Sequence, residues 1–189
     1  METKSIMIVG VGGQGTLLAS RILGNAVISQ GYDVKVSEVH GMSQRGGSVV
    51  TYVRYGEKVH SPIIDKKGAD IILAFELLEA KRALPYLKDN GKIIVNNQEI
   101  DPMPVIIGAC EYPPAIETEL TDKADTTVVN ALSLAKQAGN QKAVNVVLIG
   151  VLAKNWDIPY EVWIDTIKNT VPEKFLEINL KAFELGYNS

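Results

Sequence analysis

Residues Ile6–Gly15 read IMIVGVGGQG and decide the fold of this chain. An apolar, largely β-branched run ends directly in a Gly-x-Gly-x-x-Gly turn, and helix-forming residues follow as far as Ile28. This order predicts a strand, a tight turn and the exposed N-terminus of a helix. Backbone N–H groups and the helix dipole at such a turn favour an anion. We therefore expect a phosphate, cofactor or partner contact at Gly10, Gly12, Gly13, Gln14 and Gly15.

Strand and helix signals alternate outward from this turn. Strands are predicted at 4–9, 33–39, 48–55, 69–75, 92–96, 105–108 and 126–129, and residues 57–60 are expected to pair with 48–55 as a hairpin. Helices are predicted at 14–30, 76–88, 131–138, 145–154, 160–170 and 173–185. The pattern predicts one α/β domain over 1–189, with a three-layer, Rossmann-like, largely parallel sheet. Its core covers about 1–140, and a helical tail covers about 141–189.

Composition excludes several classes of protein. Of the 189 residues, 46% are hydrophobic and 22% charged, and the net charge of −3 gives no basic footprint for nucleic acid. The apolar runs are shorter than the ~20 residues of a membrane helix, and we expect neither a signal peptide nor a membrane partner. No metal-ligand spacing is visible. A single cysteine, Cys110, cannot hold an iron–sulfur cluster alone. We expect a cytoplasmic protein in which Cys110 is a small buried hydrophobe.

Glu38 ends the second predicted strand, about 20 residues after the glycines, where nicotinamide-binding enzymes place an acid for the ribose hydroxyl. One interpretation is therefore a self-sufficient NAD(P)- or FAD-binding oxidoreductase. Glu38 equally suits a loop-organising acceptor for Ser43 or Arg45. A nucleotide-sensing regulatory module is a third possibility.

The segment after Glu38 reads HGMSQRGG over residues 40–47 and does not belong to the dinucleotide pattern. Three glycines in so short a loop indicate close approach by another group, and a guanidinium beside exposed backbone suits phosphate or carboxylate. Both glycine loops follow the carboxyl ends of strands that we expect to be neighbours, so they should face one cleft. The candidate contacts are Gly41, Ser43, Gln44, Arg45, Gly46 and Gly47.

Several side chains keep two interpretations. Arg45 is an anion clamp or one half of an intersubunit salt bridge. His40 is a possible proton-transfer group or the donor or acceptor of a loop-bracing hydrogen bond. Glu76 and Glu79 are expected in a solvated first helical turn. Trp156 and Trp163 pack the helical tail onto the domain or onto a partner.

GVGGQG at 10–15, together with SEVHGMSQRGGSV at 37–49, resembles the signature loops of the gamma subunits of 2-oxoacid:ferredoxin oxidoreductases. The likeness is greatest to the small (beta) subunits of the branch that acts on indolepyruvate. It continues through ADIILAFELLE at 69–79 and into the helical tail. The tail positions that match are Asn145, Gly150, Asn179, Phe183 and Gly186.

The resemblance implies a subunit that holds none of the redox cofactors tightly. In the family, thiamine diphosphate and the iron–sulfur clusters sit on a larger partner, and ferredoxin is reached through that partner. The implied reaction is oxidative decarboxylation of an aryl 2-oxoacid such as indolepyruvate, with coenzyme A as co-substrate. A subunit of this kind should expose a large apolar surface when isolated.

Overall fold

The protein, described here by a computed structural model, folds around one mixed sheet, and the structure describes residues 2–41 and 46–189. The sheet order is β2-β3-β1-β4-β5-β6. The strands are β1 (Lys4–Val11), β2 (Asp33–His40), β3 (Ser48–Gly56), β4 (Ala69–Ala74), β5 (Leu87–Asn96) and β6 (Asp125–Val129). The helices are α1 (Thr16–Ser29), α2 (Leu77–Ala83), α3 (Met103–Ile106), α4 (Ile116–Lys123), α5 (Ala131–Ala138), α6 (Val144–Lys154), α7 (Tyr160–Thr170) and α8 (Leu176–Tyr187), with single 3₁₀ turns at Leu84–Tyr86, Gln141–Ala143 and Glu173–Phe175.

The sheet is largely parallel, as predicted, but one strand is reversed. β1 pairs in parallel with β4, β4 with β5, and β5 with β6. β3 runs antiparallel to both β1 and β2 and lies between them. β1 and β2 therefore point the same way without being neighbours, and their carboxyl ends share one edge of the sheet.

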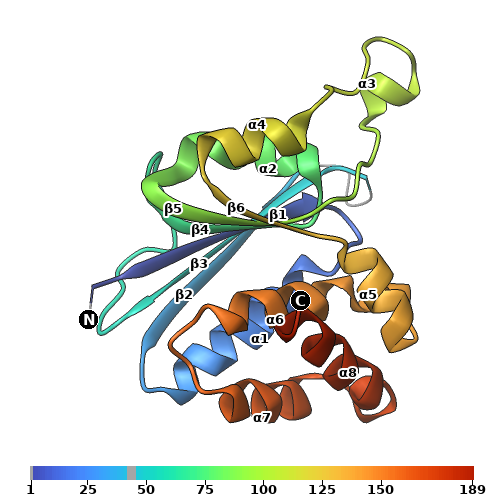
Figure 1. The fold of residues 1–189 in the computed structure, drawn as a ribbon. Coiled ribbons are helices and arrows are strands. Elements are labelled where there is room, and N and C mark those ends of the chain that lie inside the picture. The colour runs from blue at the N-terminus through green and yellow to red at the C-terminus, as the bar shows by residue number, and fades with distance from the viewer. Residues whose placement is uncertain (1, 42–45) are drawn as a thin grey trace.

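Helices cover both faces of the sheet and give three layers (Figure 1). α2 and α4 lie on one face, and α1, α5, α6, α7 and α8 lie on the other. Side-chain alternation along β1 explains this, because Ile6 and Ile8 join the core under the larger helical layer, whereas Met7 and Val9 join the core under α2 and α4. In the described part of the chain, none of the helices is long and apolar enough to cross a bilayer.

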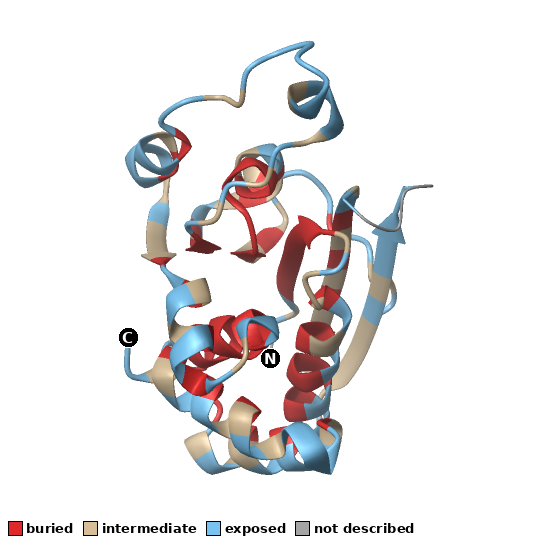
Figure 2. Cartoon of the chain, turned by 90° about the vertical axis from the view of Figure 1, so that its right-hand side faces the viewer, coloured by how far each residue is buried: buried red, intermediate tan, exposed pale blue. Residues whose placement is uncertain are grey.

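Helix α6 lies at the centre of the larger helical layer and is buried from Val144 to Ala153 (Figure 2). It crosses α8 closely at two glycines. A Cβ atom on Gly150 would stand 2.2 Å from the carbonyl oxygen of Phe183, and one on Gly186 would stand 2.0 Å from that of Val147. Only glycine permits the two backbones to approach this far.

The predicted boundaries hold best where the helical period is strong. Helices 131–138 and 160–170 are confirmed at both ends. The predicted hairpin partner at 57–60 is wrong, because the N–H of Val59 donates to the carboxylate of Asp33 at 2.8 Å instead of joining a ladder.

Two further segments differ from the prediction. The predicted strand at 105–108 is wrong, since Pro102 and Pro104 have no N–H for a sheet ladder and the chain closes the short helix α3 instead. The predicted helix at 76–88 ends early, because α2 stops at Ala83, and strand β5 begins at Leu87 instead of at residue 92, with a shift in its register with β4.

The close α6–α8 contact predicts a large effect of one methyl group. We expect Gly150→Ala to lower the free energy of unfolding by about 1–3 kcal/mol, because the backbone of α8 must move. Gly24→Ala is the matched control, since its Cβ would meet the nearest atom of Val36 at 3.9 Å. Alanine should leave stability at this helical position unchanged or raise it by up to about 1 kcal/mol. Urea unfolding of both variants gives the comparison, and equal midpoints would contradict the close contact.

Candidate functional site

The first glycine turn joins β1 to α1 and is closed by the side chain of Gln14. Its Oε1 accepts from the N–H of Val11 at 2.7 Å, and its Nε2 donates to the carbonyl oxygen of Phe75 at 3.1 Å. Gly13 and Gly15 have φ angles of +102° and +86°, which favour glycine. Both ends of the Gln14 amide are thus used inside the chain, so this side chain shapes the turn itself.

The second glycine loop meets the first, although β3 separates the two strands that lead into them. The N–H of Gly12 donates to the carbonyl oxygen of Gly47 at 2.9 Å, and that of Gly46 donates to the carbonyl oxygen of Gly12 at 3.4 Å. The two loops touch because Ser48, directly after the second loop, pairs with Val11, directly before the first. Of the candidate contacts, Ser43, Gln44 and Arg45 lie outside the described residues.

A groove of about 440 Å³ opens where the two loops meet. We call it the loop groove, and its lining is Gly12, Gly13, Gly15, Thr16, Leu17, Glu38, His40 and Val49. Helix α1 begins at Thr16 and has no side-chain cap, so the groove contains first-turn N–H groups of the kind that bind anions. Its walls are the first turn of α1 and the end of the β2–β3 hairpin.

Two polar side chains of the loop groove, Glu38 and His40, have hydrogen-bond partners within the chain. Glu38 is exposed, and one of its carboxylate oxygens accepts from the hydroxyl of Thr51 on the neighbouring strand at 3.2 Å. Nδ1 of His40 lies 3.2 Å from the carbonyl oxygen of Gly41, a contact within the loop itself. Glu38 therefore braces the hairpin, and His40 braces the start of the second loop.

A chain of side-chain amides supports the first turn from behind. Asn96, fully buried at the end of β5, donates to the carbonyl oxygen of Phe75 at 3.1 Å and accepts from the N–H of Ala131 at 3.1 Å. Asn145 donates to the carbonyl oxygen of Gly15 at 3.2 Å. Sequence reasoning missed the role of Asn96. The signal for it was a polar residue directly after the apolar run 93–95.

Two carboxylates behind the loops are buried, which corrects the expectation of a solvated helical turn. Glu76 is 1% exposed and Glu79 is 4% exposed, because the first turn of α2 faces the second loop and the segment after β5. Glu79 accepts from the hydroxyl of Ser48 and from Arg82, the latter at 2.6 Å. It thereby fixes the residue at which the second loop ends.

Glu76 caps α2 by accepting from the N–H of Glu79 at 2.8 Å. It also accepts from the N–H of Ile100 at 3.1 Å and from the hydroxyl of Tyr112. Burial raises the pKa of this carboxyl above its ordinary value, although these hydrogen bonds favour the charged form. Glu76 and Tyr112 are, like Asn96, contributions that sequence reasoning missed.

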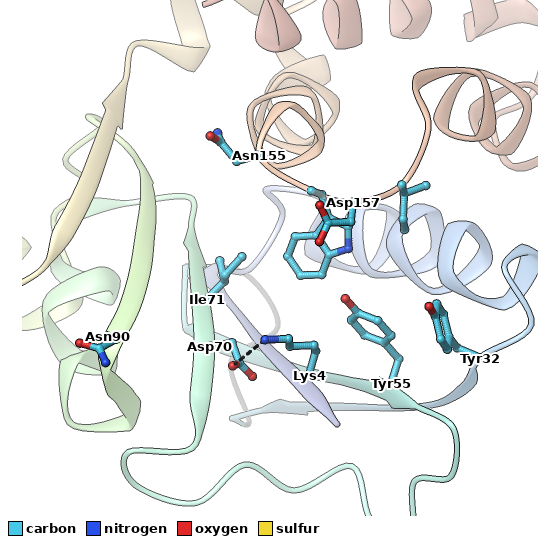
Figure 3. A pocket seen from close by; sticks show the side chains of 10 residues that line it. Lys4, Tyr32, Tyr55, Asp70, Ile71, Asn90, Asn155 and Asp157 are labelled. Atoms are coloured by element: carbon cyan, nitrogen blue, oxygen red, sulfur yellow. Dashed lines mark ion pairs between the residues drawn. The ribbon is translucent and has the colours of Figure 1, made fainter. Parts of the chain in front are cut away.

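A second cavity, of about 300 Å³, lies at the opposite edge of the sheet, beside the amino ends of β1 and β4 (Figure 3). Lys4 points at Asp70 across it, with 3.7 Å between charged atoms, and Tyr32 lies beside Tyr55. Trp156 packs on Tyr55 at 5.8 Å between ring centroids, and burial raises the pKa of Tyr55. The glycine-loop candidates lie at the other edge.

The tryptophans both belong to the domain itself. Trp163 is fully buried and stacks on Phe183, with ring centroids 6.4 Å apart. Trp156 packs the helical tail onto β3 through Tyr55, whereas Trp163 packs α7 against α8 within the tail.

Removal of the Asn96 amide should cost more than removal of an exposed cap. We expect Asn96→Leu to lower the free energy of unfolding by about 2–3 kcal/mol, because the buried N–H of Ala131 loses its acceptor. Asn130→Ala is the control. It removes an exposed N-cap, so that the N–H of Ser133 loses its acceptor. We expect this to lower the free energy of unfolding by about 1 kcal/mol. Chemical unfolding measures both, and a smaller cost at Asn96 would contradict its structural role.

Comparison with known proteins agrees over nearly the whole chain. Residues 5–189 match the family described as pyruvate ferredoxin/flavodoxin oxidoreductase. The chain is similar to an indolepyruvate oxidoreductase subunit IorB of Thermococcus kodakarensis, at 43% identity over 192 residues, which cover 98% of this chain and 95% of the relative. It is also similar to a ketoisovalerate oxidoreductase subunit VorA of Methanothermobacter marburgensis, at 28% identity. That match covers 96% of this chain but only 35% of the longer VorA chain.

The fold recurs in solved structures. The pyruvate oxidoreductase subunit PORC of Thermotoga maritima superposes with a TM-score of 0.77 at 19% identity, covering 100% of this chain and 97% of the other. A keto/oxoacid ferredoxin oxidoreductase gamma subunit of Geobacter sulfurreducens gives a TM-score of 0.73 at 24% identity, covering 98% and 96%. The family resemblance inferred from the two glycine loops is confirmed. The chain belongs to the pyruvate ferredoxin/flavodoxin oxidoreductase family.

Proposed function

We propose that this chain is the small subunit of an indolepyruvate:ferredoxin oxidoreductase and that it works only within the complex. The meeting of the two glycine loops at one groove carries the proposal, because two signature segments that share a groove can contact the same ligand or partner. The identity of 43% to an IorB subunit supports the choice of aryl 2-oxoacids as substrates. We further propose a cytoplasmic location, where an exposed thiol such as that of Cys110 stays reduced.

In the proposed reaction, an aryl 2-oxoacid loses carbon dioxide, its acyl group passes to the thiol of coenzyme A, and the electron pair passes to ferredoxin. Thiamine diphosphate on the larger subunit would supply the carbanion stabilisation for decarboxylation, and iron–sulfur clusters there would carry the electrons. This chain would supply binding and orientation.

The loop groove suits a phosphate at one of its walls. The first turn of α1 offers N–H groups and the positive end of the helix dipole, and Gly13 has no Cβ to obstruct a close approach. The carboxylate of Glu38 on the opposite wall disfavours a second anion there. We propose that a coenzyme A phosphate, or the edge of a cofactor held by the larger subunit, lies on the α1 side, with Arg45 as its cationic partner.

A self-sufficient NAD(P)- or FAD-binding enzyme is the alternative, and the strand order speaks against it. Dinucleotide folds place the acidic residue on the parallel strand next to β1. Here β3 lies between β1 and β2, so Glu38 stands one further strand away, about 4.8 Å in the plane of the sheet. Glu38 also accepts from Thr51.

Reconstitution tests the proposal directly. The chain is assayed alone and with the larger subunit, with indolepyruvate, coenzyme A and an artificial electron acceptor. We expect activity only in the mixture, because the proposed redox cofactors belong to the larger subunit. An inactive mixture, combined with saturable NAD(P)H binding by the isolated chain, would replace the proposal with the dinucleotide alternative.

Arg45 distinguishes a phosphate clamp from a structural loop. In the reconstituted complex, we expect Arg45→Ala to raise the Michaelis constant for coenzyme A roughly tenfold or more, since a charge-assisted hydrogen bond is lost. Arg21→Ala, which removes an exposed charge on α1, should leave the constant unchanged. If neither the Michaelis constant nor turnover responds to Arg45→Ala, the anion-clamp role is refuted.

A further inference from the structure

The connection between β5 and α4 carries an exposed apolar projection. We call residues Asp101–Glu111, with the sequence DPMPVIIGACE, the arm. Met103, Ile106 and Ile107 are 64%, 65% and 69% exposed, which exceeds every other exposed large hydrophobic side chain in the described ranges. The arm stands away from the three layers (Figures 1 and 2), so no other element in the described ranges covers these side chains.

The arm is nevertheless closed by its own backbone. Ile107 N–H donates to the carbonyl oxygen of Met103 at 3.0 Å, and Ala109 N–H donates to that of Pro104 at 2.8 Å. Gly108 has a φ angle of +74°, which turns the chain back after the apolar run. Pro102 and Pro104 further restrict the unbound conformations. The arm thus presents its apolar side chains in a defined shape before any partner binds.

Both stems of the arm are held by one buried carboxylate. Oε1 of Glu76 accepts from the N–H of Ile100 on the incoming stem and from the hydroxyl of Tyr112 on the outgoing stem. The same tyrosine oxygen accepts from the N–H of Leu78 at 3.2 Å, and the carbonyl oxygen of Gln98 accepts from the N–H of Leu77 at 3.0 Å. The base of the arm is therefore fixed to the first turn of α2.

The arm shares its edge of the sheet with the glycine loops. It leaves from the carboxyl end of β5, and the glycine turn leaves from the carboxyl end of β1. Gln98 and Ile100 on the incoming stem also line a hollow of about 530 Å³ together with Gly13, Gln14 and Gly15. A molecule that grips the arm therefore lies close to the first glycine turn.

We propose that the arm is a preformed anchor that inserts into an apolar cleft on the larger subunit of the oxidoreductase. This inference rests on the proposed function and specifies the contact that joins the two subunits. Residues 102–110 carry no charged side chain, so the cleft is apolar, whereas Asp101 and Glu111 at the two ends call for basic residues at its rim.

The larger subunit is the occupant that the relatives favour. In VorA, the matching region makes up 35% of a longer chain, so the remainder of that polypeptide is covalently attached to the equivalent domain. A domain that is joined to a longer polypeptide in that relative works beside it, and we take the larger subunit as the corresponding neighbour of this chain. Because the backbone of the arm is already held by its own hydrogen bonds, little conformational entropy is lost on binding, and this favours tight binding.

The single cysteine of the chain lies in the arm and is exposed, so it reports on this contact without substitution. The native chain is treated with N-ethylmaleimide alone and after complex formation, and modification of the Cys110 peptide is measured by mass spectrometry. We expect the rate to fall roughly tenfold or more in the complex, because a covered thiol is shielded from the reagent. An unchanged rate in an active complex would overturn the anchor and leave the proposed function standing.

Substitutions in the arm test its contribution to affinity. We expect the double variant Ile106→Asp/Ile107→Asp to weaken binding of the larger subunit roughly 10- to 100-fold, because charge is forced into an apolar cleft. Ile63→Asp is the matched control. Ile63 is 50% exposed and lies after β3, at the opposite edge of the sheet, and its replacement should leave affinity unchanged. Circular dichroism checks that both variants keep the fold.

The remaining outcomes separate the two proposals. Equal affinities of the double variant and wild type would refute the anchor alone. Protection of Cys110 in the isolated chain that grows with its concentration would assign the arm to a second copy of this chain and likewise refute it. If the wild-type chain does not bind the larger subunit at all, the proposed function fails and the anchor fails with it.

Discussion

The carbonyl oxygen of Phe75 is the point on which the carboxyl edge of the sheet depends. It accepts from the side-chain amides of Gln14 and Asn96, each at 3.1 Å, while the N–H of Phe75 donates to Val9 at 2.9 Å. One fully buried residue thereby joins the ends of β1, β4 and β5, and loss of one of these partners would leave a buried polar group unpaired. The glycine turn, the start of α5 and the root of the arm are all positioned relative to it.

Much of this architecture follows from local sequence pattern. The glycine turn and the strong helical periods at 131–138 and 160–170 are readable from residue order. The two loops were expected to meet because β1 and β2 were expected to be neighbours, but they meet because β3, which follows the second loop, pairs with β1. The reversed strand was missed, although residues 41–47 are too few for a parallel crossover and favour a hairpin. Insertion of β3 between β1 and β2 depends on pairing between distant segments, which local pattern does not show. Buried Glu76 and Asn96 were also hidden, since burial of a polar side chain depends on neighbours far along the chain.

The arm shows a different reason for failure. Its run VII over 105–107 looks like a buried strand because β-branched side chains of this kind usually pack inside a domain. An apolar segment predicts that its side chains are covered, but it does not predict whether the same chain or another molecule covers them. Two prolines deny the run a ladder, and its exposure in this chain agrees with coverage by another. The same reasoning explains why Cys110, expected to be buried, is exposed.

The crossing of α6 and α8 has a consequence for biosynthesis. Helix α6 covers the sheet but is itself covered by α8, through backbones that touch at Gly150 and Gly186. During synthesis, Ile6, Ile8 and Leu73 stay uncovered until residues 144–153 have been made. Those residues in turn stay uncovered until 176–187 have been made. The sheet face under the larger helical layer therefore cannot be covered until most of the chain has left the ribosome. During that interval the nascent chain exposes the apolar side chains of this face, which makes it prone to aggregation.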